Sequence, residues 1–326
     1  MKYIKNTVCC LLLSLACIAP AVFASVYKLG PVGDDLVGTV SSTVVKEGEN
    51  FHSIAHRYDI GFIELVEANP GVNPLETPAG TVLILPSRYI LPNAPREGVV
   101  INLAEMRLYY YPKGKGEVWT FPVGIGREGS QTPNGPMKVM EHIVHPTWHA
   151  PESVIAERAK EGVIVPKIVP PGPDNPLGDY ALRLSRPTYL IHGTNDNSGV
   201  GRRSSAGCLR MYPEDIDKLF HAVKNGDSIL VVNEPYKLGR HNDYVYIEGH
   251  LPLQEVKDSF QHLDKILDGY LVELGGYRAQ QAVDMKKAIK IASEQQGMPQ
   301  RVGQLGTPSN ITPIEKPLIK VEGVDG

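Results

Sequence analysis

The spacing of apolar residues between residues 98 and 126 predicts a run of short strands. Apolar positions cluster or alternate at 99–103, 107–111 and 118–123, and glycines at 114 and 116 separate the last two clusters. Alternation over four to eight residues, bounded by turn residues, is typical of β-strands. This part of the chain is therefore expected to open a sheet.

The same pattern continues downstream and is interrupted by one helix. We expect further strands at 137–143, 180–184, 188–192 and 228–232. Between the last two, residues 214–223 place four apolar side chains at helical spacing, which are Ile216, Leu219, Phe220 and Val223. Residues 156–178 are rich in proline and glycine and predict a loop over a cleft, or a mere connector. Residues 98–233 are therefore predicted to form a mainly β domain with few helices.

Two other regions flank this domain and show different patterns. Residues 43–86 predict a strand, two short helices and a strand, in the order βααβ. Residues 87–97, with Pro92 and Pro95, are expected to be a linker. Residues 234–326 predict a partly helical region, with a strand at 245–248, helices at 253–274 and 279–295, and a mobile tail from 300.

The first 24 residues have the features of a signal peptide. Lys2 and Lys5 precede an apolar core at 8–18, which is too short to span a bilayer, and Ala24 offers a cleavage site. An uncleaved anchor, or a lipoprotein modified at Cys17, are the alternatives. Cleavage after Ala24 predicts export to an oxidising compartment.

Composition narrows the range of functions. The formal net charge is −3, with 33 basic and 36 acidic residues, so no basic patch indicates nucleic-acid binding. Of the four cysteines, Cys9, Cys10 and Cys17 lie in the predicted signal peptide. The exported chain would then keep Cys208 as a single thiol, which cannot form an internal disulfide.

Cys208 and His192 form the candidate catalytic pair. A thiolate attacks carbonyl carbon, and an imidazole can take the thiol proton and later return it to a leaving amine. Pro213 and the acids after it predict a helix start close behind Cys208, whose field would favour the thiolate. The alternative is that Cys208 is a small buried apolar residue.

The histidines of the chain do not predict a metal site. His142, His145 and His149 could join His192, but their spacing fits no helix face and no acidic or cysteine ligand accompanies them. We therefore predict no metal and no cofactor.

Residues 192–210 resemble the catalytic motif of L,D-transpeptidases, the YkuD fold. The matching residues are His192-Gly193-Thr194 and Ser205-Ala206-Gly207-Cys208-Leu209-Arg210, preceded by the turn Thr132-Pro133-Asn134-Gly135. Many members carry a second histidine where this chain has Ala206, and a periplasmic Gram-negative subset has a small residue there. The resemblance implies a β-sandwich-like catalytic domain with His192 as the base, and a location in the periplasm.

Residues 43–86 resemble a LysM module, through Val45-Lys46-Glu47-Gly48-Glu49, Asn69-Pro70 and Leu83-Ile84-Leu85-Pro86. The resemblance implies binding of N-acetylglucosamine-containing glycan of peptidoglycan. The alternative is a spacer that binds no sugar.

Together the resemblances imply a transpeptidase that cleaves the diaminopimelate–D-alanine bond of tetrapeptide stems through a thioester at Cys208. Gly207 and Cys208 would supply oxyanion N–H groups, Arg210 would bind a substrate carboxylate or form a structural ion pair, and Gly193, Ser205 and Thr194 would shape the loop. The acceptor would be a second stem, the C-terminal lysine of an outer-membrane lipoprotein, or water, as in a carboxypeptidase or hydrolase. Carbapenems would acylate Cys208. A non-catalytic LysM wall-binding protein is the alternative from a different class.

Overall fold

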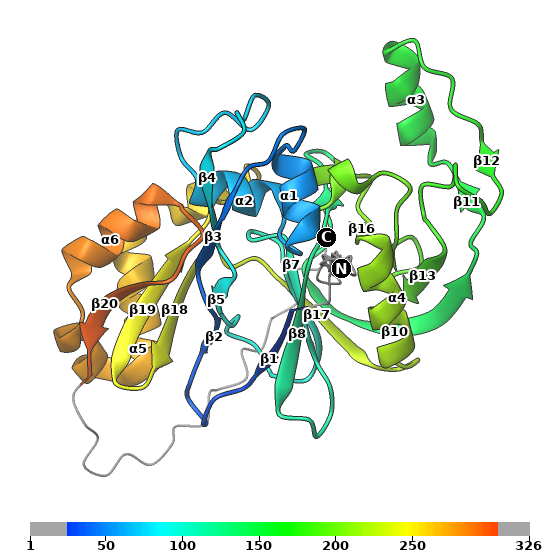
Figure 1. The fold of residues 1–326 in the computed structure, drawn as a ribbon. Helices are drawn as coiled ribbons and strands as arrows, with labels where there is room; N and C mark the ends of the chain where they lie inside the picture. Colours follow the sequence, from blue (N-terminus) through cyan, green and yellow to red (C-terminus); the bar gives the residue numbers. More distant parts are fainter. Residues whose placement is uncertain (1–24, 306–326) are drawn as a thin grey trace, which may run out of the picture.

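One large curved sheet forms the centre of the molecule in the computed structural model, which describes residues 25–305 (Figure 1). Its strands lie in the order β1-β8-β7-β6-β17-β10-β13-β14-β16. The pairs β6·β17 and β14·β16 are parallel, and the other neighbours are antiparallel. The strands are β1 (Ser25–Lys28), β6 (Gly98–Asn102), β7 (Arg107–Tyr111), β8 (Glu117–Pro122), β10 (Gly135–Val144), β13 (Tyr180–Leu184), β14 (Leu190–His192), β16 (Leu209–Arg210) and β17 (Ser228–Val232). The mainly β character of the catalytic region is confirmed.

Helix α4 (Pro213–Ala222) covers one face of this sheet. Ile216, Leu219 and Phe220 are buried in the same apolar cluster as the sheet residues Leu182 and Ile191. The predicted apolar face of the helix is therefore confirmed. Pro213 occupies the first helical turn, where the missing N–H of proline costs no hydrogen bond.

Strand β7 is buried on both faces. Leu108 and Tyr110 face the cluster beneath α4, whereas Tyr109 and Tyr111 belong to a second cluster on the opposite face. Successive side chains on a strand point to opposite sides, so the sheet separates two cores. This second core is why every residue of β7 is buried.

Residues 41–85 form the small unit with the predicted order. It contains β3 (Ser41–Val44), α1 (Phe51–Arg57), α2 (Phe62–Ala68) and β4 (Val82–Leu85). Asn50 caps α1 by accepting a hydrogen bond from the Ser53 amide at 3.0 Å. Phe51, Ile54, Leu65 and Leu83, among others, form its core. The βααβ prediction is confirmed.

This unit packs closely on the catalytic domain. The backbone of Gly61 approaches that of Gly201 so nearly that a Cβ on Gly201 would lie 2.3 Å from the Gly61 Cα. The amide of Ile63 donates to the carbonyl oxygen of Gly201 at 3.1 Å, and His56 pairs with Glu214 at 2.6 Å. The small unit therefore braces both α4 and the loop that leads to Cys208.

Residues 87–97 are not a linker, contrary to the prediction. They contain β5 (Arg88–Ile90), which pairs with β2 (Leu36–Gly38). Tyr89 and Ile90 are buried, and the Ile90 amide donates to Glu248 Oε2 at 2.6 Å. The two prolines that suggested a linker follow the strand and end it.

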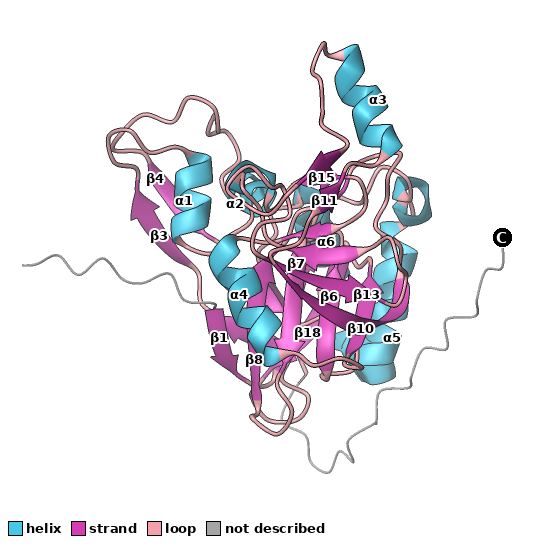
Figure 2. Cartoon of the chain, turned by 90° about the vertical axis from the view of Figure 1, so that its right-hand side faces the viewer, coloured by secondary structure: helices cyan, strands magenta, loops and turns pink. Residues whose placement is uncertain are grey.

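An arm projects beside the sheet and holds α3 (Glu152–Lys160) and the hairpin of β11 (Trp148–His149) and β12 (Ile168–Val169) (Figure 1, Figure 2). No residue of α3 is buried. The loop predicted for 156–178 is thus partly wrong, because 156–160 are helical. Arg127 forms an ion pair with Glu157 and ties the arm to the catalytic loops.

The C-terminal region is partly helical, as predicted, and its helices pack against a small sheet. Three antiparallel strands, β18 (Tyr236–His241), β19 (Tyr244–Gly249) and β20 (Gln300–Gln304), pack against α5 (Leu263–Ala282) and α6 (Met285–Glu294). A short 3-10 helix, η2 (Lys257–Phe260), precedes α5, which is interrupted at Gly275 and Gly276. Residues 300–304 were expected in a mobile tail, but Val302 is buried and β20 completes the sheet.

Two sequence predictions lie outside the described residues. They are the signal peptide at 1–24 and the remainder of the tail at 306–326. Within residues 25–305, even the longest helices lack the combination of length and apolar character that crossing a bilayer requires.

Candidate active site

The register of β14 and β16 brings the predicted catalytic residues to one edge of the large sheet. His192 lies opposite Arg210, and Ile191 lies opposite Leu209. Cys208 directly precedes β16, two positions before Arg210. Paired residues of parallel strands share a face, as do residues two apart along a strand. His192 and Arg210 therefore lie on the same face of the sheet, and the charge of Arg210 acts on both His192 and Cys208.

The hydrogen bond of His192 defines its tautomer. Nδ1 lies 2.6 Å from the carbonyl oxygen of Gly193, and this oxygen can only accept, so Nδ1 carries the proton. The unprotonated Nε2 then has a free lone pair for a proton from a thiol. Burial, together with the nearby charge of Arg210, lowers the pKa of His192 to about 3. His192 is therefore a neutral imidazole at neutral pH.

Cys208 is a partly exposed free thiol whose Sγ lies 3.6 Å from the carbonyl oxygen of Thr188. Burial raises the pKa of Cys208, while the Leu190 backbone amide and the Arg210 charge act in the opposite direction. The resting pair is thus thiol and neutral imidazole. The expected thiolate at a helix N-terminus is wrong, because β16 separates Cys208 from α4 and the helix field fades within one turn.

Two hydroxyl groups fix the backbone around Cys208. Ser205 Oγ donates to the carbonyl oxygen of Cys208 at 2.5 Å and accepts the Gly207 amide at 3.1 Å. Thr132 Oγ1 donates to the Gly207 carbonyl oxygen at 2.8 Å and accepts the Gly126 amide at 3.0 Å. Because the Gly207 amide is engaged, the Cys208 amide is the better candidate for an oxyanion donor. Sequence reasoning missed Thr132, although its threonine-proline turn was noted.

The remaining predicted site residues surround the pair in different roles. Thr194 Oγ1 closes a local turn with the backbone of Asp196, and the Gly193 amide donates to Tyr180. The backbone of Arg210 pairs with Gly124, and its guanidinium packs on Gly199, where a Cβ would lie 2.1 Å from Nη1. Its buried Nε donates to no acceptor among residues 25–305. The neighbouring charges that act on Arg210 are those of Asp196 and Cys208.

Two of the histidines with metal-ligand chemistry, His142 and His145, have other partners. His142 contacts Asn225 Oδ1 at 2.8 Å, and His145 pairs with Asp179 at 3.4 Å. The metal-like cluster in the described part of the chain consists instead of Glu105, Glu248 and His250.

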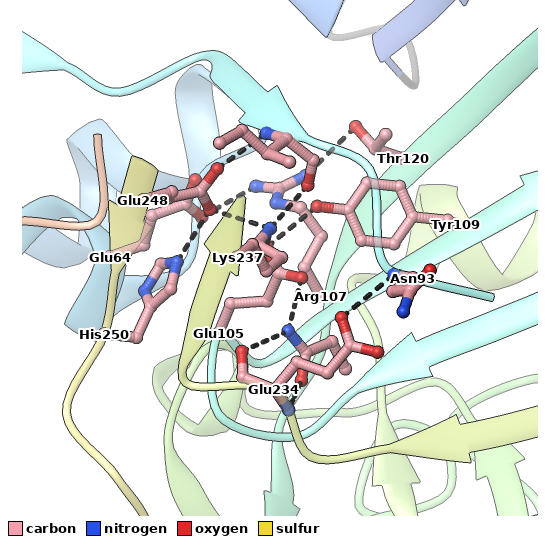
Figure 3. A network of polar contacts seen from close by, with 12 residues as sticks. Glu64, Asn93, Glu105, Arg107, Tyr109, Thr120, Glu234, Lys237, Glu248 and His250 are labelled. Atoms are coloured by element: carbon pink, nitrogen blue, oxygen red, sulfur yellow. Dashed lines mark hydrogen bonds and ion pairs between the residues drawn. The ribbon is translucent and has the colours of Figure 1, made fainter. Parts of the chain in front are cut away.

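A lysine supplies the positive charge in that cluster. Lys237 Nζ lies 2.7 Å from Glu105 and 2.8 Å from Glu248, and it is drawn between them in Figure 3. His250 also contacts Glu248 at 2.8 Å, and it reaches Glu67 of α2 at 3.0 Å. This buried network joins the C-terminal unit to the catalytic domain and to the small βααβ unit. Because a lysine supplies its positive charge, it is a structural ion-pair network rather than a metal site.

The lowered pKa of His192 predicts the pH dependence of acylation. A base with a pKa of about 3 stays unprotonated above that pH, so the acid limb expected for an ordinary histidine near pH 6.5 should be absent. We expect the rate of Cys208 acylation by a carbapenem to change by less than about twofold between pH 5 and 7. Intact-mass kinetics measure this rate, with the melting temperature followed at each pH. A limb with a midpoint between pH 6 and 7 would contradict the tautomer and burial assigned to His192.

The comparisons with known proteins identify two domains in the chain. Residues 96–232 match the L,D-transpeptidase catalytic domain (YkuD), and residues 43–86 match the LysM domain. The chain is 42% identical to the probable L,D-transpeptidase YcfS of Escherichia coli K12 over 72% of this chain and 75% of that protein. It is 39% identical to the probable L,D-transpeptidase YbiS of the same organism, over 86% and 92% of the two chains.

Solved structures with a related fold include L,D-transpeptidase 3 from Mycobacterium tuberculosis, at 16% identity and a TM-score of 0.32, over 65% of this chain and 99% of that one. The catalytic domain of an Enterococcus faecium L,D-transpeptidase has 20% identity and a TM-score of 0.34, over 43% and 100%. The identities over most of the chain to curated relatives decide the assignment: the chain belongs to the L,D-transpeptidase family and carries a LysM domain before its catalytic domain.

Proposed function

We propose that the enzyme acts in the periplasm, after cleavage behind Ala24, on tetrapeptide stems of peptidoglycan. The observation that carries the proposal is the placement of His192 opposite Arg210, whose charge also acts on Cys208, with Nδ1 of His192 engaged and Nε2 directed elsewhere. A thiol, a neutral base and a guanidinium are the groups that acyl transfer from a carboxylate-bearing peptide needs.

The proposed reaction has two halves. His192 Nε2 takes the thiol proton as Cys208 Sγ forms a bond to the carbonyl carbon of diaminopimelate, and the Cys208 amide stabilises the oxyanion. The bond to D-alanine then breaks, and His192 gives its proton to the departing amine. A thioester remains. An acceptor amine loses its proton to His192, attacks the thioester and releases Cys208.

Arg210 is proposed to bind the terminal carboxylate of the donor stem. Its Nε is buried and unsatisfied in the described part of the chain, and its charge already acts on both His192 and Cys208. A carboxylate would satisfy the guanidinium fork. The LysM domain, braced against the loop before Cys208, would hold the glycan strand near this site.

Muropeptide analysis tests the proposal and its acceptor. The enzyme is incubated with tetrapeptide-rich sacculi, with and without a peptide ending in lysine. We expect loss of D-alanine with stem–lysine adducts when the peptide is present, as in lipoprotein anchoring, and 3–3 cross-links when it is absent. Tripeptide stems without any adduct in either arm would contradict transfer and identify a carboxypeptidase. Unchanged sacculi would contradict the substrate.

A further inference from the structure

The first described residue is held at the junction between the LysM and catalytic domains. Ser25 begins β1 and lies opposite Thr120 of β8, so pairing with the large sheet fixes its position. Its backbone nitrogen donates to Oδ2 of Asp59 at 3.1 Å. Asp59 follows α1 in the LysM domain and takes a left-handed backbone conformation, with φ of 55°. The backbone nitrogen of a catalytic-domain strand therefore contacts a LysM carboxyl group directly.

That carboxyl group belongs to a buried acidic pair. Asp59 is 2% exposed and Asp215, in the first turn of α4, is 0% exposed. The two carboxyl groups are close enough to share a proton. Apart from this contact, Oδ1 of Asp59 and both oxygens of Asp215 accept no hydrogen bond from residues 25–305. Buried carboxylates without donors are costly, so this site favours a further cation.

Two cations lie near the pair: Arg107, which is committed mainly to Glu64, and Lys218, which forms a long ion pair with Asp215. Arg107 forms an ion pair with Glu64 at 2.7 Å and gives its other contact at this site to the carbonyl oxygen of Asp59, at 3.3 Å. Lys218 lies 3.6 Å from Asp215. Burial and the neighbouring Asp215 raise the pKa of Asp59, and burial raises the pKa of Asp215 to about 6. The resident charges therefore leave the acidic pair undercompensated.

We propose that the α-ammonium group of mature Ser25 is the cation that this site takes, and that it locks the LysM domain to the catalytic domain. This inference rests on the proposed cleavage after Ala24. An export signal peptidase adds water across the Ala24–Ser25 bond, which leaves a carboxylate on Ala24 and an amine on Ser25 that becomes protonated. The amide donates one N–H and carries no charge, whereas the ammonium donates three and carries one positive charge.

The position of the pair gives this clamp a functional consequence. Asp59 lies in the LysM domain, Asp215 lies in α4, and Ser25 lies in β1, so the ammonium would join three elements. The same interface holds the Ile63 amide on the Gly201 carbonyl oxygen, in the loop before Cys208. Removal of the leader would thus complete the support of the catalytic loop only after export.

The test uses the chain from Ser25 to Gly326 with a free amine or with an acetylated one. Acetylation removes the charge and keeps one N–H, so no side chain is changed. We expect the acetylated chain to melt at least about 3 °C lower. In Asp59→Asn, where asparagine tolerates the left-handed backbone, the same comparison should differ by less than about 1 °C. Glu117→Gln, which removes the other acid that pairs with β1, is the control and should leave the full effect of acetylation.

Two outcomes would overturn the proposal: equal melting temperatures for the free and acetylated chains, or an acetylation effect of the same size in Asp59→Asn. If that variant does not fold, reductive methylation decides. The α-amine of Ser25 should react at least about tenfold more slowly than that of a chain beginning at Phe23, and equal rates would overturn the clamp. N-terminal sequencing of the exported protein tests the cleavage site separately, because the purified chains begin at Ser25 wherever the cell cuts.

Discussion

Cys208→Ala is expected to reduce D-alanine release from tetrapeptide stems by at least about 10⁴-fold, because no other group in the site can form the thioester. The same change should abolish the covalent carbapenem adduct in intact-mass spectra. The fold should survive, since the Ser205 hydroxyl bonds to the backbone oxygen of residue 208 and not to its sulfur. Binding to intact sacculi should also survive, because the LysM domain is untouched.

Ser204→Ala is the matched control for this variant. Ser204 lies four residues before Cys208 in the short strand β15 (Arg203–Ser205), and its hydroxyl donates to the Gly199 carbonyl oxygen at 3.0 Å without contacting Cys208. We expect its activity to stay within about tenfold of wild type, the cost of one loop hydrogen bond. Activity in Cys208→Ala above a tenth of wild type would refute the nucleophile. Loss of sacculus binding together with activity would show instead that the substitution unfolds the protein.

Local patterns predicted the elements that carry the site. Ile216, Leu219 and Phe220 recur at helical spacing and form the buried face of α4, because the helix lies on a sheet that was itself predicted from alternation. The strand that carries His192 and the lone Cys208 could be identified from residue types alone. The curated relatives confirm the family assignment made from the motif.

The parts that sequence reasoning missed depend on distant partners. Strand β5 forms because it pairs with β2 and because Ile90 hydrogen-bonds to Glu248 and Lys237 of the C-terminal unit. Strand β20 forms because it pairs with the edge of β19. Neither segment has a strong pattern of its own. The resting state of Cys208 was also missed, since burial raises its pKa and no sequence pattern reports burial of a thiol.

Lys237→Met is expected to lower the free energy of unfolding by about 3–5 kcal/mol, as for a buried ion pair that loses one partner. Lys237 is 3% exposed and is the ammonium between Glu105 and Glu248. Methionine preserves most of the side-chain volume, so the loss reports charge rather than packing. Urea unfolding measures it, provided the transition remains cooperative. Lys28→Met, at an exposed pair with Glu117, is the control and should cost less than about 1 kcal/mol.

The reverse test uses the acids of the same network. Adding Glu105→Gln to Lys237→Met removes one of the two carboxylates that Lys237→Met leaves without their cation. The double variant should therefore recover part of the lost stability.

The pH dependence of the stability should follow His250. Its burial lowers its pKa, but its contacts with Glu248 and Glu67 outweigh this and raise the pKa to about 10. A raised pKa stabilises the fold below the unfolded value near 6.5, and this contribution is lost as pH rises toward 10. Equal stability of Lys237→Met and wild type at pH 7 would show that Glu105 and Glu248 are held by other cations, and that the three units do not depend on this network.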